Sequence, residues 1–225
     1  MHVVIQASTY AVLMGDLVKS ERSEAPSDLH VRFNQAIERQ NHARRKLLAS
    51  PLTITLGDEF QSLVTSFTVA AAIARDIRLE LLNAGIDCRF ALGAARLTTP
   101  LNTQRAWNMM GPGLSATRER LNEKKSNSLY RFVVPEDPVL ETLLEASGAT
   151  LTSIERKWSD VQRRDITALL EGEDVNAIAK RRNVSVHNIY KVRASGDYDL
   201  YVIQWHAVHE ALAALDRKFE MKGAG

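Results

Sequence analysis

The stretches AVLMGDLVKS at residues 11–20 and LTITLGDEFQ at residues 52–61 each begin as an apolar run and place Gly-Asp where that run ends or turns. A bare carboxylate at a buried strand end is costly, so buried carboxylates are usually paired or bound to a metal ion. Two carboxylates brought side by side form a site of hard oxygen ligands, which suits Mg²⁺ with a phosphate substrate. The sequence therefore predicts an acidic centre built on Asp16 and Asp58.

The segments around these two acids predict a ferredoxin-like α+β domain. Apolar periodicity and turn residues predict a strand, a helix, a hairpin, a second helix and a further strand. In that order they cover residues 10–18, 28–48, 52–64, 68–84 and 87–97. This is the βαββαβ order of ferredoxin-like folds and of cyclase and polymerase palms. In that topology the end of the first strand meets the hairpin turn at the sheet edge, so Asp16 and Asp58 should lie close together.

A change of composition divides the chain into two parts. A helix over residues 114–124 and a strand over residues 129–134 extend the first part, and two prolines in Pro135-Glu136-Asp137-Pro138 then prevent regular structure. We therefore place a palm-like domain at residues 1–135 and an all-helical domain at residues 136–225. The helical part is expected to begin with a short helix that Gly148 stops.

Residues 175–190 have the form of a helix-turn-helix. Ile178 and Ala179 would pack the first helix, Asn183 suits a left-handed turn, and Ser185 would cap the second helix. Between residues 175 and 195 there are five Lys or Arg and no acid, which suits phosphate contacts, although basic helix faces are often merely solvated. The residues expected to contact DNA are Lys180, Arg181, Arg182, Ser185, Val186, His187, Asn188, Lys191 and Arg193.

The last predicted helix, over residues 197–219, carries a heptad seam. Its apolar positions alternate in steps of four and three at Tyr201, Trp205, Val208, Leu212, Leu215 and Phe219. The seam is expected either to pair with its copy in a homodimer or to pack on the helix-turn-helix core.

Composition argues against a disulfide-bonded, zinc-binding, membrane-spanning or secreted protein. The chain has 225 residues, a net charge of +2 and one cysteine, Cys88, so it forms no intramolecular disulfide and has no zinc-binding pattern. No apolar run reaches the length of a membrane span, and the start of the chain does not resemble a signal peptide. A cytoplasmic protein is expected.

The acidic layout resembles the catalytic palm of class III nucleotide cyclases and of GGDEF cyclases, because Leu56-Gly57-Asp58-Glu59-Phe60 lies close to the GGDEF signature. The resemblance implies Mg²⁺ or Mn²⁺ held by Asp16, Leu17, Asp58 and Glu59. It also implies nucleotide contacts, which fall on Lys19, Ser20, Gly57 and Ser115. A transition-state arginine would be either Arg118 or Arg120.

The sequence also departs from these cyclases. Leu56 replaces the first glycine of GGDEF, and Thr53, Ile54 and Thr55 occupy the run where many class III cyclases carry an adenine-reading lysine. The alternative explanation of the two acids is a capped turn and a surface hairpin, and Lys19 and Ser20 would then belong to a solvated loop.

Nearly the whole chain resembles the SatD family of bacterial proteins, through residues 15–20, 56–61 and 189–195. Three functions fit these features. The first is a dimeric DNA-binding regulator whose palm-like domain senses a nucleotide or metal-nucleotide. The second is an active nucleotidyl cyclase with a regulatory or assembly module. The third is a protein-interaction module.

Overall fold

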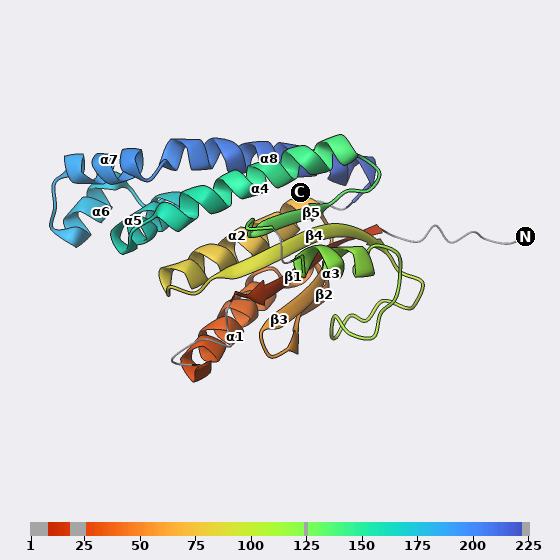
Figure 1. Cartoon of the computed structure of the whole chain (residues 1–225). Helices are drawn as coiled ribbons and strands as arrows, with labels where there is room; N and C mark the ends of the chain where they lie inside the picture. The colour runs from red at the N-terminus through yellow and green to blue at the C-terminus, as the bar shows by residue number, and fades with distance from the viewer. Residues whose placement is uncertain (1–8, 19–25, 124–125, 222–225) are drawn as a thin grey trace, which may run out of the picture.

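The computed structural model describes residues 9–18, 26–123 and 126–221, and its centre is a five-stranded sheet. The strands lie in the order β2-β3-β1-β4-β5, with bounds Leu48–Leu56, Glu59–Val64, Thr9–Leu17, Cys88–Arg96 and Tyr130–Val133. β1 pairs antiparallel with β3 and β4, and β5 adds a parallel edge strand to β4. Figure 1 shows helices on both sides of this sheet.

The four strands and two helices from β1 to β4 confirm the predicted βαββαβ order. α1 (Pro26–Ala43) follows β1, and α2 (Phe67–Asn83) joins β3 to β4. The predicted helix over 28–48 extends too far, because the chain leaves α1 at Ala43, makes one short helical turn, η2 (Arg45–Leu47), and enters β2 at Leu48. Pro51 does not delay the strand, since β2 is an edge strand with irregular register, where proline is tolerated.

The two faces of the sheet bury different sets of side chains. Ala11, Leu13 and Leu17 of β1 face the main core, which α1 and α2 cover. Val12 and Met14 point to the opposite face and pack against α3 (Leu114–Leu121). This alternation, which the period of a strand requires, also places Asp16 on the face that α3 covers.

α3 approaches the sheet closely because β4 has no side chain at Gly93. A Cβ atom there would lie 2.2 Å from the Thr117 hydroxyl oxygen and 3.2 Å from Val133. The glycine therefore fixes the distance between α3 and the sheet.

Five helices follow β5: α4 (Pro138–Lys157), α5 (Asp160–Leu170), α6 (Val175–Arg182), α7 (Val186–Ser195) and α8 (Tyr198–Lys218). The expectation that Gly148 stops the first of them is wrong, because α4 continues through Gly148 to Lys157. A Cβ atom at Gly148 would lie 2.4 Å from the Tyr130 carbonyl oxygen. Gly148 thus allows α4 to pack against β5. None of the described helices combines the length and apolar composition needed to cross a bilayer.

The heptad seam of α8 packs inside the same chain. Tyr201, Leu212 and Leu215 are at most 2% exposed, and they belong to the core that also contains α2 and α4. Figure 1 shows α4 and α8 running side by side along one layer of the molecule. The seam therefore provides no interface for the predicted homodimer, which stays a prediction, and the segments before and after residue 135 share one core.

Candidate functional site

The acidic centre lies where β1 ends. Asp16 stands directly opposite Glu59 of β3 on one side and Arg89 of β4 on the other. The Leu17 amide donates a hydrogen bond of 3.0 Å to the Asp58 carbonyl, so the hairpin turn after β2 lies against the end of β1. The fold thus brings together Asp16, Leu17, Asp58 and Glu59, the four residues predicted to hold a metal ion.

Arg89 binds both carboxylate oxygens of Asp16. Its Nε donates to Oδ1 at 2.5 Å and its Nη2 donates to Oδ2, while Asp16 is only 6% exposed. Burial raises the pKa of the Asp16 carboxyl, and the hydrogen bonds and charge of Arg89 oppose that rise. The hydrogen bonds to Asp16 raise the pKa of Arg89, so the guanidinium stays charged. Sequence reasoning missed Arg89, because only strand register reveals that it faces Asp16.

The second arginine of the centre is Arg118 of α3. Its Nη2 donates to Gln61 Oε1 at 2.8 Å, and its Nη1 lies 3.3 Å from Glu59 Oε2. Ser115, one turn earlier on α3, lines the same cavity as Arg118. Of the two arginines that the resemblance left open, Arg118 therefore lies at the acidic centre.

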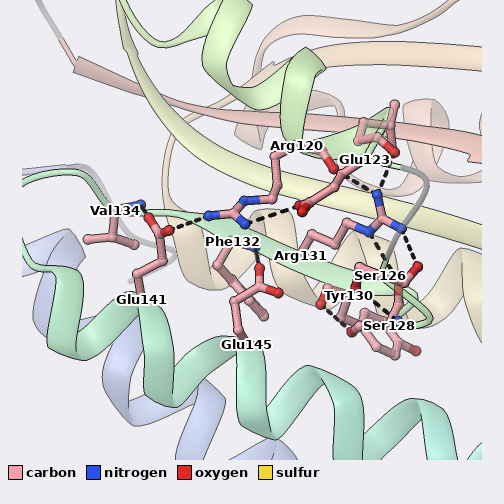
Figure 2. A network of polar contacts seen from close by, with 11 residues as sticks. Arg120, Glu123, Ser126, Ser128, Tyr130, Arg131, Phe132, Val134, Glu141 and Glu145 are labelled. Carbon is pink, nitrogen blue, oxygen red and sulfur yellow. Dashed lines mark hydrogen bonds and ion pairs between the residues drawn. The ribbon is translucent and has the colours of Figure 1, made fainter.

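Arg120 points the other way, toward α4. It forms ion pairs with Glu141 and Glu123, and Figure 2 shows it between these two carboxylates. Glu141 also accepts a hydrogen bond from the Val134 amide at 2.6 Å. Arg120 thus ties α3 to α4 and β5, and its position does not suit a role at the acidic centre.

The buried Arg131, next to Arg120 in Figure 2, stabilises the main chain around the end of α3. It is 1% exposed and donates to the main-chain carbonyls of Ser128, Arg120, Leu121 and Ser126 at 2.8–3.2 Å (Figure 2). Two of these carbonyls lie at the C-terminal end of α3, where unpaired acceptors collect. Arg131 therefore anchors the end of α3 to β5.

Two cavities adjoin the acidic centre on the side of the sheet that α3 covers. They have volumes of about 550 and 390 Å³ and share Gln61, Met109 and Arg118. Ser115 lines the first, and Thr55 and the exposed Trp107 line the second or its rim. Both linings combine apolar side chains with Gln61 and Arg118, which suits a small polar organic molecule, and Glu119 adds a carboxylate to the first cavity only.

The residues present do not fit a divalent ion in this arrangement. Both oxygens of Asp16 are engaged by Arg89, and Glu59 is paired with Arg118. Across residues 9–18, 26–123 and 126–221, no three His, Cys, Asp or Glu side chains are grouped so as to hold a metal. Gly57 occupies the hairpin turn with φ +53°, whereas Lys19 and Ser20 lie outside the described residues.

The helical end of the molecule carries the second group of predicted residues. Ile178 and Ala179 of α6 and Ile189 of α7 are buried in a small core of their own with Ala168 of α5. Asn183 adopts the left-handed conformation with φ 54° and ψ 48°, and Ser185 caps α7 by accepting from the Asn188 amide. Figure 1 shows α5, α6 and α7 grouped at one end of the molecule.

The side chains on the outer surface of α7 include His187, Asn188 and Lys191, all exposed, with Val186 half-buried. Three of the five basic residues are in ion pairs: Arg181 with Glu173, Arg182 with Asp165, and Arg193 with Asp199. Asp165 is only 1% exposed, whereas Glu173 and Asp199 are in contact with solvent. Lys180 and Lys191 are exposed and have no ion pair in the part of the chain that the structure describes.

Comparison with known proteins identifies one family and several solved structures of low sequence identity. The model of the SatD family matches residues 10–196. A search of curated proteins found no match to this sequence. Among solved structures, a bacterial light-regulated adenylyl cyclase is similar at 12% identity and a TM-score of 0.42, over 56% of this chain and 43% of that one.

Two further cyclase domains are similar to this chain at comparable TM-scores and over the same share of it. The guanylyl cyclase domain of the RhoGC fusion protein from Blastocladiella emersonii has 16% identity and a TM-score of 0.41, over 56% of this chain and 79% of that one. The guanylate cyclase domain of RhGC from Catenaria anguillulae, solved in complex with GTP, has 16% identity and a TM-score of 0.39, over 56% and 78% of the two chains. At TM-scores below 0.5 these similarities assign this chain neither a ligand nor an activity.

Proposed function

This chain belongs to the SatD family, and we propose that it is a DNA-binding regulator whose sheet binds a nucleotide. The observation that supports DNA binding most is the geometry of α6 and α7. Two short helices are joined by a three-residue turn in which Asn183 is left-handed, and the capped start of α7 is exposed. This is the arrangement in which a helix-turn-helix presents its second helix to the major groove.

The first turn of α7 supplies the groups that read bases. Asn188 is exposed and offers an amide able to make paired hydrogen bonds with adenine. His187 lies beside it, and Val186 has an apolar side chain suited to a thymine methyl group. Ile189, in contrast, is fully buried, so it fixes the rotation of α7 rather than contacting DNA.

The basic residues proposed to contact phosphate differ in whether they already form an ion pair within the protein. Lys180 and Lys191 are exposed, and Arg181 and Arg193 have solvent-accessible partners that a phosphate can replace at little cost. Arg182 differs, because leaving Asp165 would strand a buried carboxylate. We therefore assign Arg182 to the packing of α6 on α5 rather than to phosphate.

Nucleotide binding is supported by the cavities beside Arg118. The Arg118 side chain is 40% exposed, so its guanidinium can donate hydrogen bonds to phosphate oxygens, and Gln61 and Ser115 add polar groups to the same cavity. The alternative, an active cyclase using two metal-binding aspartates, receives less support, because Asp16 is already paired with Arg89.

The experiment is a selection of duplexes from a random pool with the full chain, followed by affinity measurements with and without ATP or GTP. We expect one enriched sequence and an affinity for it that changes at least about fivefold with nucleotide, the usual lower range of coupling between two sites. Failure to enrich any sequence, together with equal weak binding to all duplexes, would remove the regulator hypothesis. Enrichment without any nucleotide effect would restrict the proposal to DNA binding.

A further inference from the structure

The pairing of Asp16 with Arg89 follows from the register of the sheet. The two residues are direct partners across β1 and β4, and the alternation of each strand points both toward the face that α3 covers. The fork of the guanidinium matches the two carboxylate oxygens, which is the strongest geometry for such a pair. The pair is thus built into the strand pairing and does not depend on a flexible loop.

A divalent ion at Asp16 would have to displace this guanidinium. Mg²⁺ and Mn²⁺ bind carboxylates through the same oxygens that now accept from Arg89, and they demand a nearly regular octahedron of oxygen ligands. An ion placed beside the pair would also face the positive charge of Arg89 at short range. Arg89 therefore competes with a metal both for the oxygens and through its charge.

We infer that Arg89 takes the place of a divalent ion at Asp16, so that the acidic end of the sheet binds no Mg²⁺ or Mn²⁺ in the native protein and removal of this guanidinium creates a metal site. Asp16 would then stand bare beside Glu59 and the hairpin turn that carries Asp58. The inference concerns the sheet alone and does not depend on whether α7 binds DNA.

The test measures Mn²⁺ binding to the full chain by the loss of the electron paramagnetic resonance signal of the free ion. The proteins are the native chain, Asp16→Asn, Arg89→Ala, and Arg89→Ala combined with Asp16→Asn. Arg96→Ala is the matched control, because Arg96 lies at the opposite end of the same strand and faces Thr9 of β1. Far-ultraviolet circular dichroism verifies that each variant is folded.

We expect the native chain, Asp16→Asn and Arg96→Ala to bind Mn²⁺ equally weakly. Arg89→Ala should bind one additional ion per chain at least about tenfold more tightly than the native chain, a difference of about 1.4 kcal/mol. The double variant should lose that ion. Because the additional ion depends on Asp16, binding at other surface carboxylates cancels in the comparison.

Two results would overturn the inference. One is Mn²⁺ binding by the native chain that Asp16→Asn weakens about tenfold or more, since the native site would then hold metal despite Arg89. The other is a folded Arg89→Ala protein without the additional ion. If Arg89→Ala does not fold, Arg89→Gln retains much of the side-chain length without the charge, and the comparison of the native chain with Asp16→Asn is still decisive.

Discussion

Replacing Glu155 by glutamine should loosen the junction between the sheet and the long helices. Glu155 of α4 is fully buried and accepts three hydrogen bonds, from Arg78 Nε of α2 at 2.8 Å, from the Tyr130 hydroxyl of β5 at 2.6 Å and from the Tyr201 hydroxyl of α8 at 2.9 Å. Burial raises the pKa of both tyrosines, so both hydroxyls remain donors. One carboxylate thus joins four elements of the fold.

The magnitude follows from what the substitution leaves behind. Breaking a buried ion pair from one side costs about 3–5 kcal/mol, because the remaining charge is uncompensated. Arg78 keeps a bond of 2.8 Å from Nη1 to the partly exposed Asp87, which favours the lower end of that range. At about 2–4 °C per kcal/mol for a chain of this length, a loss of about 3 kcal/mol lowers the melting temperature by about 6–12 °C.

The assay is urea unfolding followed by circular dichroism, with Glu80→Gln as the control. Glu80 also pairs with an arginine, Arg39 of α1, but that pair is exposed and should contribute less than about 1 kcal/mol. The combined variant Arg78→Met and Glu155→Leu should be more stable than Glu155→Leu alone, because it leaves no fully buried charge unpaired, and the Asp87 carboxylate that loses Arg78 is partly exposed to solvent. The reasoning is refuted if Glu155→Gln destabilises the protein no more than Glu80→Gln does.

Four further substitutions have defined outcomes. Asn188→Ala should relax sequence preference at one base pair, at a cost of about 1–3 kcal/mol in discrimination, and leave the salt dependence unchanged; binding to single-base variants of the selected duplex tests this. Lys191→Ala should lower the slope of log K against log salt by about 1 on every duplex, and an unchanged slope would remove Lys191 from the phosphate contacts. Arg182→Ala should instead lower the free energy of unfolding by about 3 kcal/mol, because it leaves Asp165 buried and unpaired. Urea unfolding measures this loss, and an unchanged free energy of unfolding would contradict the role assigned to the pair. Gly93→Ala should cost about 1–3 kcal/mol through overpacking against α3, and a melting temperature equal to that of the native chain would contradict the close approach.

Local patterns in the sequence predict much of this fold because they carry its periodicities and turns. The apolar run that ends at Asp16, the turn at Gly57, the periodicity of the two helices and the alternation in the last strand together predict the βαββαβ order and the meeting of the first strand with the hairpin. Asn183 and Ser185 likewise determine the turn between α6 and α7 through their own backbone and side-chain preferences.

What the sequence does not reveal depends on contacts between distant segments. Arg89 lies 73 residues from Asp16, so only strand register shows that the two form an ion pair. Gly148 is typical of a helix end in sequence, but its role depends on the proximity of Tyr130. The seam of α8 predicts a buried stripe, and only the tertiary structure shows that α2 and α4 of the same chain bury it.

The central claim, that α7 enters the DNA groove, is tested most directly by cleavage from a tethered reagent. The single cysteine, Cys88, is fully buried, so an iron chelate with a thiol-reactive arm should label only an introduced cysteine. Ala194→Cys places the reagent on α7 at an exposed position seven residues after His187, and Val31→Cys places it on α1 as the control. We expect strand cleavage confined to the selected site from the α7 label and none from the α1 label. A protein that binds the duplex but cleaves it only from α1, or from neither position, would contradict the account.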